Sequence, residues 1–253
     1  MSRAPGTWDR FWSSKGNLAD VYPSSPRVVA TVLERLPGDS PRVLEIGAGT
    51  GRDTAEVAAR GARAVALDAA PESLALIARA HPDLRGRGIV GGDALHLPFK
   101  DGTFDVVFHQ GVLEHFGNPH AFLIENRRVM RPGGFLVVDV PQTWHPWTLL
   151  KRAALRVDRW FAGWETDYTM EELEAIVRAA GFEVLDGYAD TMVPSLPYRL
   201  VREAGKRVGM HLPLRPPAPA ALRRARAHVR ERFLETAAAR RFAHTIGVVG
   251  RRP

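Results

Sequence analysis

Residues 43–51 read Val-Leu-Glu-Ile-Gly-Ala-Gly-Thr-Gly, an apolar run that passes directly into three alternating glycines. The apolar run predicts a buried parallel strand, because strands covered on both faces are apolar throughout. Gly47, Gly49 and Gly51 allow positive φ and bring bare backbone close to a ligand, and a helix is expected directly behind them. This turn from strand to helix predicts a ligand site in an α/β fold.

The next apolar strand ends at Asp68, seventeen residues after Gly51. An acidic side chain at the end of the second strand can accept hydrogen bonds from both hydroxyls of a ribose. The alternative is that Asp68 caps the following helix, whose first turn would hold Pro71. The residues alone leave both interpretations open.

Two other kinds of glycine-rich loop are disfavoured by the residues that follow Gly51. Dinucleotide sites have the spacing G-x-G-x-x-G, and Arg52 stands where the third glycine belongs. A phosphate-binding P-loop requires Gly-Lys-Ser or Gly-Lys-Thr, whereas Arg52 and Asp53 follow Gly51 here. The predicted ligand is therefore a nucleoside without a phosphate chain.

Later segments extend the pattern in order. They are Asp68, Gly-Asp-Ala at 92–94 with Leu-Pro-Phe at 97–99, the strand and turn at 104–116, and Arg-Pro-Gly-Gly at 131–134. With the loop at 43–51, they resemble the class I S-adenosylmethionine-dependent methyltransferases, in particular the small-molecule or quinone-type branch, over residues 40–185. The resemblance implies S-adenosylmethionine as cofactor, S-adenosylhomocysteine as product, and no metal.

The resemblance also implies which residues hold the cofactor. Asp68 matches the ribose-binding acid, Asp93 matches the residue that accepts from the adenine amino group, and His109 and Gln110 are expected beside the methionine portion. Arg10, in a flap that includes Trp8 and Trp12, is expected to pair with the cofactor carboxylate, although this arm could simply anchor itself by hydrophobic contact. The predicted set is Arg10, Glu45, Gly47, Ala48, Gly49, Thr50, Gly51, Asp68, Ala69, Gly92, Asp93, Ala94, His109 and Gln110.

For the chemistry, His115 is the leading candidate for a general base, because an imidazole has an unperturbed pKa near 6.5. Glu114 is expected to orient the base or to bind a cationic substrate. The alternative is that Leu113, Glu114 and His115 only open or cap a helix. No His, Asp or Glu cluster has the spacing of metal ligands, so no metal site is predicted.

Two segments depart from the minimal fold of this family. Residues 143–168 are predicted to form a basic amphipathic lid, with Trp144, His145, Trp164 and Tyr168 as substrate contacts. Ordinary packing and docking on a membrane surface are the alternatives. Residues 190–244, rich in proline and arginine, are predicted to be a helical insertion at the mouth of the site or a dimer contact, with one helix over 220–243.

Strand and helix signals alternate along the chain, which predicts an α/β fold. We expect a Rossmann-like, seven-stranded, mostly parallel sheet with helices on both faces, and the resemblance implies an antiparallel last strand. The expected organisation is an N-terminal helical arm over residues 1–36 and a methyltransferase domain over residues 37–253.

Composition narrows the possible functions further. The chain has 253 residues, no cysteine and a net charge of +7, so disulfides, a thiol nucleophile and cysteine-ligated metals are excluded. Residues 190–253 contain 14 lysines and arginines against four acidic residues, whereas residues 1–189 contain 21 against 24. A nucleic acid, an anionic substrate or a membrane surface would explain this basic quarter, as would a merely solvated helical face. With neither a signal peptide nor a membrane span in the sequence, a cytoplasmic monomer or homodimer is expected.

We therefore expect methyl transfer to a small-molecule or lipid-like acceptor, at oxygen, nitrogen or carbon. The first rival is a nucleic-acid methyltransferase that uses the basic insertion; it lacks the Asn/Asp-Pro-Pro-Tyr/Phe signature of amino-group methylation, and its basic segment has few aromatic residues. The second rival is a regulatory or scaffold protein that binds the cofactor without turnover.

Overall fold

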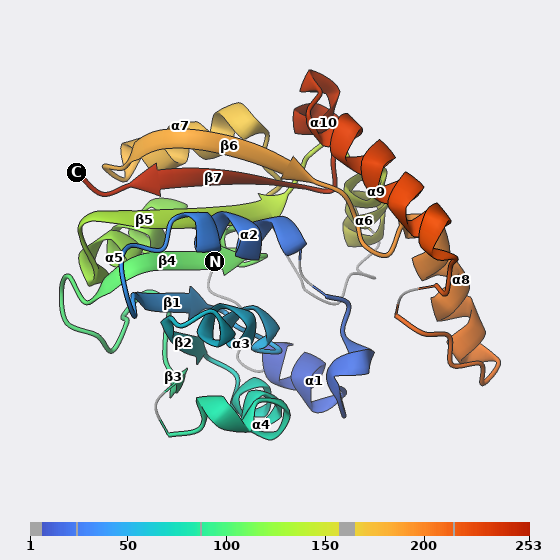
Figure 1. Cartoon of the computed structure of the whole chain (residues 1–253), viewed down its shortest axis with the longest axis horizontal. Helices are drawn as coiled ribbons and strands as arrows, with labels where there is room; N and C mark the ends of the chain where they lie inside the picture. Colours follow the sequence, from blue (N-terminus) through green and yellow to red (C-terminus); the bar gives the residue numbers. More distant parts are fainter. Residues whose placement is uncertain (1–6, 24, 87, 157–164, 215) are drawn as a thin grey trace.

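A seven-stranded sheet organises the chain (Figure 1). The computed structural model describes residues 7–23, 25–86, 88–156, 165–214 and 216–253. The strand order is β3-β2-β1-β4-β5-β7-β6, and only β7 runs antiparallel to its neighbours. The strands are β1 (Arg42–Ile46), β2 (Arg63–Asp68), β3 (Ile89–Gly91), β4 (Phe104–Gln110), β5 (Met130–Pro141), β6 (Glu183–Asp190) and β7 (Thr245–Arg251). The predicted α/β fold and its antiparallel last strand are confirmed.

Helices cover both faces of the sheet, and each face has its own core. Because successive side chains of a strand point to opposite faces, Val43 packs with α2 and α3, while Leu44 packs with α5 and α7. The α-helices are α1 (Thr7–Ser13), α2 (Pro26–Glu34), α3 (Arg52–Ala59), α4 (Pro71–Ala80), α5 (Pro119–Val129), α6 (Pro146–Arg156), α7 (Met170–Ala179), α8 (Leu196–Arg207), α9 (Ala220–Leu234) and α10 (Ala237–Phe242). Three short 3-10 helices are η1 (Leu18–Asp20), η2 (Pro82–Leu84) and η3 (Leu113–His115).

Local sequence signals explain where several helices begin. The Thr169 side chain accepts from the backbone of Glu172, and Glu172 bonds back to the backbone of Thr169, which is the predicted capping box of α7. The single helix expected over 220–243 is wrong. It breaks into α9 and α10 because the Thr236 hydroxyl accepts from the Ala239 N–H and starts a new helix.

The segment between β6 and β7 forms an arm of three helices, α8 to α10, at one side of the molecule (Figure 1). Arg230 of α9 pairs with buried Asp190 at the end of β6, and Arg202 of α8 donates to the Ala19 carbonyl of the N-terminal segment at 2.9 Å. The arm is thus tied both to the sheet and to the first residues of the chain. None of the helices that the structure describes combines the length and hydrophobicity that a membrane crossing requires.

Candidate active site

The glycine loop follows β1 and leads into α3. The three glycines have φ values of +69°, +55° and +67°, a region that L side chains rarely adopt. A Cβ atom on Gly47 would lie 2.6 Å from Val112, and one on Gly49 would lie 2.8 Å from the Trp12 ring. The glycines are therefore required both by backbone conformation and by neighbours that pack against bare backbone.

Asp68 ends β2 beside this loop. One carboxylate oxygen accepts from the Gly49 N–H at 2.8 Å and the other from the Ala70 N–H at 2.9 Å. Asp68 does not cap α4, because the N-cap residue is Ala70 and no side chain caps that helix, whereas Asp68 does line a cavity. Burial raises the pKa of Asp68, and these backbone donors oppose that rise by stabilising the carboxylate.

A large cavity of about 940 Å³ opens above the loop. Eleven of the predicted cofactor residues line it: Glu45, Gly47, Ala48, Gly49, Thr50, Asp68, Ala69, Gly92, Asp93, Ala94 and Gln110. His115, the predicted base, lines it too. We call this space the cofactor cavity. Predicted residues from four separate segments of the sequence therefore surround one cavity.

Three predicted cofactor residues do not line this cavity. Gly51 lies behind the loop, where it starts α3. The His109 ring is fully buried 4.8 Å from the Phe122 ring, and burial lowers its pKa to about 3. Arg10 is exposed on α1. The structure therefore brings Gln110, but not His109 or Arg10, to the cavity.

The N-terminal segment walls the cofactor cavity with Trp8, Trp12, Val21 and Tyr22. Arg52 holds this wall in place: its guanidinium donates to the Val21 carbonyl at 3.1 Å and also to the Leu18 carbonyl. The side chain that replaces the third glycine of a dinucleotide loop therefore has a structural use here.

Replacing Arg52 by methionine should release this wall, because methionine keeps much of the apolar stem and removes both donors. We expect faster amide hydrogen exchange over residues 18–22 and about tenfold weaker binding of S-adenosylmethionine, since two hydrogen bonds contribute roughly 1–3 kcal/mol together. Arg60→Met, at the C-cap of the same helix, is the control. Unchanged exchange over residues 18–22 would show that Arg52 does not hold the segment.

His115 lines the cofactor cavity and belongs to a group of titratable side chains. Its ring nitrogens lie 3.9 Å from Glu114 and 4.0 Å from Glu165, and the Trp8 ring packs edge-on against it at 5.2 Å. Glu165 is in turn bonded to buried Lys151 at 2.8 Å. Burial, followed by the charge of Glu165, raises the pKa of Glu114 well above its usual range. Glu114 lies next to His115 but beyond hydrogen-bond distance, and its own side chain does not line the cavity.

The predicted substrate contacts of the lid lie elsewhere. Trp144 is 45% exposed, Tyr168 is buried, and neither lines the cofactor cavity. The His145 ring packs edge-on against the His244 ring, with the ring centroids 5.1 Å apart. His145 itself does not line the cofactor cavity. Trp164 lies outside the described residues.

A second, smaller cavity of about 200 Å³ adjoins the first. It lies where β4, β5 and β7 meet the arm, and it shares Tyr22, Gln110 and Gly111 with the cofactor cavity. We call it the second cavity. The other residues that line it are Pro23, Ser25, Asp139, Pro141, Thr191, Val193, Arg199, His244 and Thr245.

Hydrogen bonds join several polar groups of the second cavity to one another. Gln110 donates to Asp139 at 2.9 Å and accepts from the Ser25 N–H at 3.0 Å, and Thr245 donates to Asp139 at 3.3 Å. Burial raises the pKa of Asp139 to about 8. Arg199 stacks on the Tyr22 ring, 4.2 Å from its centroid.

Apart from Gln110, sequence reasoning missed these residues. Only Asp139 carries a signal, as a single acid within the apolar run of β5, because a buried strand position is costly for an unpaired carboxylate. Tyr22, Arg199 and His244 come from segments without a recognisable motif.

The buried carboxyl of Asp139 predicts a pH dependence of stability. Its folded pKa of about 8 exceeds the unfolded value near 3.9, so the unfolded chain loses this proton first as pH rises. The contribution of the Asp139 carboxyl to the free energy of unfolding is fully present below about pH 4 and is lost as pH rises to about 8. In Asp139→Asn, the fall in the free energy of unfolding with rising pH should be smaller than in the wild type by more than about 1.4 kcal/mol, the equivalent of one pKa unit.

Urea unfolding at pH 5 and pH 8.5 measures this effect. The quantity compared is the difference in free energy of unfolding between wild type and Asp139→Asn at each pH. The control is Asp83→Asn, which changes an exposed carboxylate. Equal differences at both pH values would contradict the assignment.

The cofactor cavity fits S-adenosylmethionine on its own features. The loop offers backbone where any Cβ would collide, Asp68 keeps lone pairs beyond its two backbone bonds, and Trp8 and Trp12 supply apolar walls. Among the described residues, no group of three His, Asp or Glu side chains is placed to hold a metal ion.

Comparison with known proteins agrees with this site. A methyltransferase domain family matches residues 44–138. The chain is 31% identical over 195 residues to a ubiquinone biosynthesis O-methyltransferase of Cereibacter sphaeroides, covering 70% of this chain and 78% of that protein. It is 40% identical over 126 residues to a demethylmenaquinone methyltransferase of Beutenbergia cavernae, covering 49% of this chain and 50% of that protein. The chain belongs to the class I S-adenosylmethionine-dependent methyltransferases, as the sequence led us to expect.

A solved structure shows the same fold. Phosphoethanolamine N-methyltransferase 2 of Haemonchus contortus, in complex with phosphomonomethylethanolamine and S-adenosylhomocysteine, superposes with a TM-score of 0.62 at 16% identity, covering 98% of this chain and 57% of that chain. At this identity the likeness concerns the fold alone. The chain spans between about a third and a half of the length of three curated relatives that it matches.

Proposed function

We propose that this protein transfers a methyl group from S-adenosylmethionine to a small polar acceptor held in the second cavity. One observation carries the proposal: the two cavities share Tyr22, Gln110 and Gly111, so ligands in them would meet at the end of β4. In this arrangement the protein contributes alignment and exclusion of water.

Residues of the cofactor cavity have separate parts in this proposal. Asp68 would accept from the ribose hydroxyls, Asp93 would accept from the adenine amino group, and the backbone of Gly47 and Gly49 would lie against the remainder. When bound, S-adenosylmethionine supplies an electrophilic methyl group and leaves as S-adenosylhomocysteine. Trp8 and Trp12 would exclude water from this side.

The second cavity suits an acceptor that carries a hydroxyl or an amine. Arg199 brings a positive charge, because a guanidinium with its pKa lowered to about 10 by burial is still protonated at neutral pH. Burial lowers the pKa of His244 to about 3, so this ring is neutral and can accept or donate one hydrogen bond. An acceptor with anionic character is favoured, and oxygen is the preferred atom.

Proton removal has two candidates, one in each cavity. Asp139, in its ionised form, would take the proton of an acceptor hydroxyl in the second cavity, and a pKa of about 8 suits a base that works near neutral pH. His115 would act from the cofactor cavity. We favour Asp139, because Gln110 positions it where the cavities meet.

Calorimetric titration with S-adenosylmethionine and S-adenosylhomocysteine, with NAD and ATP as controls, tests the cofactor part. Selective one-site binding is expected, and its absence in folded protein would overturn the proposal. A screen of hydroxyl and amine acceptors with labelled methyl groups then tests turnover. Binding without turnover on any acceptor would favour the scaffold alternative.

A further inference from the structure

Helix α8 has an unusual distribution of side chains. Positions 197, 200, 201, 204 and 208 share one face of a helix with 3.6 residues per turn, and all five are exposed apolar residues. Leu200 is 54% exposed, Val201 57% and Val208 71%, and Met210 beyond the helix end is 54% exposed. We call these four residues the apolar face of α8.

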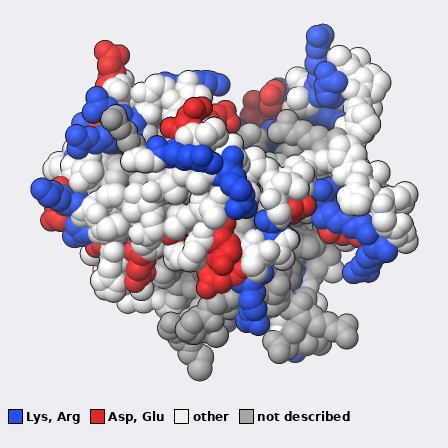
Figure 2. Space-filling view, turned by 90° about the horizontal axis from the view of Figure 1, so that it is seen from below, with Lys and Arg blue, Asp and Glu red and all other residues white. Residues whose placement is uncertain are grey.

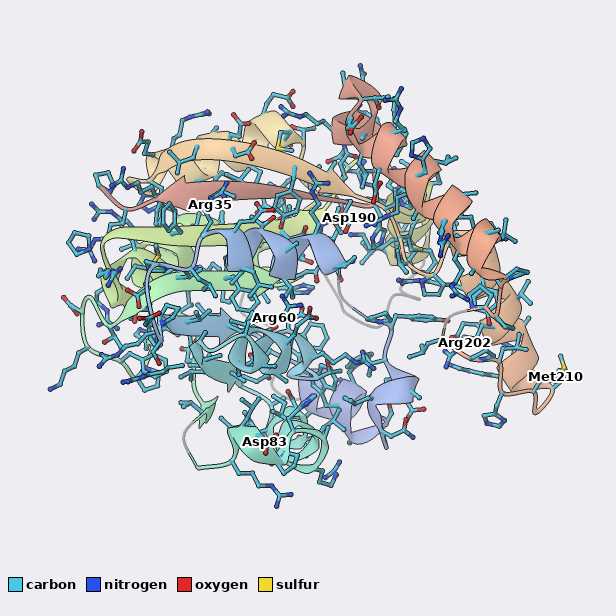
Figure 3. The ribbon with its side chains drawn as sticks, in the orientation of Figure 1. Arg35, Arg60, Asp83, Asp190, Arg202 and Met210 are labelled. Carbon is cyan, nitrogen blue, oxygen red and sulfur yellow. The ribbon has the colours of Figure 1, made fainter. Side chains whose placement is uncertain are left out.

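The opposite face of α8 carries the charges, and its arginines reach the second cavity and the N-terminal segment. Arg199 lines the second cavity, and buried Arg202 donates to the carbonyls of Ala19 and Leu212. Figure 3 shows Arg202 on the inner side of the helix and Met210 at its outer end. A helix that places arginine inward and valine outward is inverted relative to an ordinary surface helix.

The surroundings of the apolar face are strongly basic. The arm from residue 196 to 242 contains twelve lysines and arginines and three acidic residues. Helix α9 has no buried residue, and its arginines lie along an exposed helix. In the space-filling view, uncharged surface at the side that carries the arm is bordered by Lys and Arg (Figure 2).

We infer that the apolar face of α8 docks on the surface of an anionic lipid bilayer. Aliphatic side chains bordered by arginine and lysine match the boundary between acyl chains and anionic head groups, where both kinds of group are satisfied. The arm of a second copy would bring a further net charge of +9 (twelve basic against three acidic residues) to the same side, and a nucleic acid would leave Val201 and Val208 facing phosphates.

The position of this surface suits an acceptor that is itself anchored in lipid. Arg199 and Val201 lie two residues apart on α8, the first lining the second cavity and the second on the apolar face. Because residues two apart on a helix point in nearly opposite directions, α8 lies between the two, and docking would place the second cavity about one helix diameter, roughly 10 Å, from the lipid surface. This part of the inference rests on the proposed function, whereas docking itself does not.

Flotation with vesicles of phosphatidylcholine, alone or with 30% phosphatidylglycerol, tests docking without cofactor or acceptor. The wild-type protein should float with the anionic vesicles at least about tenfold more than with neutral ones, and 0.5 M salt should reduce binding. Val201→Asp and Val208→Asp should each reduce binding to anionic vesicles at least tenfold. Ile124→Asp, which places the same charge at an exposed aliphatic residue of α5, should leave it unchanged.

Equal flotation of wild type and the two α8 variants would overturn the inference. So would a stable dimer in sedimentation that Val208→Asp dissociates, because the apolar face would then belong to a second copy. Salt-sensitive binding of single-stranded RNA without vesicle binding would assign the arm to nucleic acid. The vesicle test uses no cofactor, so its result can be interpreted even if the protein transfers no methyl group.

Discussion

Replacing Asp68 by alanine is expected to weaken binding of S-adenosylmethionine at least about a hundredfold. The change removes the acceptor of the Gly49 and Ala70 N–H groups and, on the proposed assignment, also the acceptor of two ribose hydroxyls. Hydrogen bonds to a charged group contribute about 1.5–3 kcal/mol each, so loss of two ligand bonds alone amounts to roughly 3–6 kcal/mol. Calorimetric titration measures the change.

Two further variants separate the causes. Asp83→Ala removes an exposed carboxylate just after α4 and should leave affinity unchanged. Asp68→Asn keeps the shape and one acceptor oxygen, so its affinity should fall between those of wild type and Asp68→Ala. Wild-type affinity in Asp68→Ala would remove the ribose assignment.

Gly49→Ala should destabilise the protein by about 2–5 kcal/mol. A residue other than glycine at positive φ costs roughly 1–2 kcal/mol, and forcing a methyl group into a packed contact costs a further 1–3 kcal/mol. Here the new Cβ would lie 2.8 Å from the Trp12 ring, so that α1 must shift from the cofactor cavity. Urea unfolding and cofactor titration both report on this change.

The chain offers a matched control for backbone strain. Gly38 has φ of +52°, close to the +55° of Gly49, but nothing lies within 4 Å of its expected Cβ. Gly38→Ala should therefore lower the free energy of unfolding by only roughly 1–2 kcal/mol, the conformational cost alone. Adding Trp12→Ala to Gly49→Ala should restore part of the loss. Equal losses in Gly38→Ala and Gly49→Ala would show that contact with Trp12 is unimportant.

The cofactor cavity was largely predictable because its residues follow consecutive strands. Parallel strands end at one edge of the sheet, so the loop after β1, Asp68 after β2 and Asp93 after β3 meet without any knowledge of distant contacts. His109 shows the limit of this reasoning. Its neighbour Gln110 faces the cavities, and because side chains alternate along a strand, His109 points instead into the core against Phe122.

The second cavity was not predictable in the same way. Its walls come from Tyr22, Asp139, Arg199 and His244, which are separated by long stretches of chain and share no spacing. The inverted pattern of α8 was readable in the residues themselves, but only the structure shows which face is turned outward. If the second cavity holds the acceptor, as proposed, specificity lies in parts of the fold that no local motif describes.

The place of β7 in the sheet has a consequence for biosynthesis. Strand β6 pairs with no strand other than β7 within the described residues, and β7 lies between β6 and β5. Since a ribosome releases residues 183–190 long before residues 245–251, β6 and the helices of the arm emerge while the slot beside β5 is still open. The sheet closes only when its seventh strand inserts, so a nascent chain leaves the backbone N–H and C=O groups along this edge of β5 unpaired until β7 has been translated.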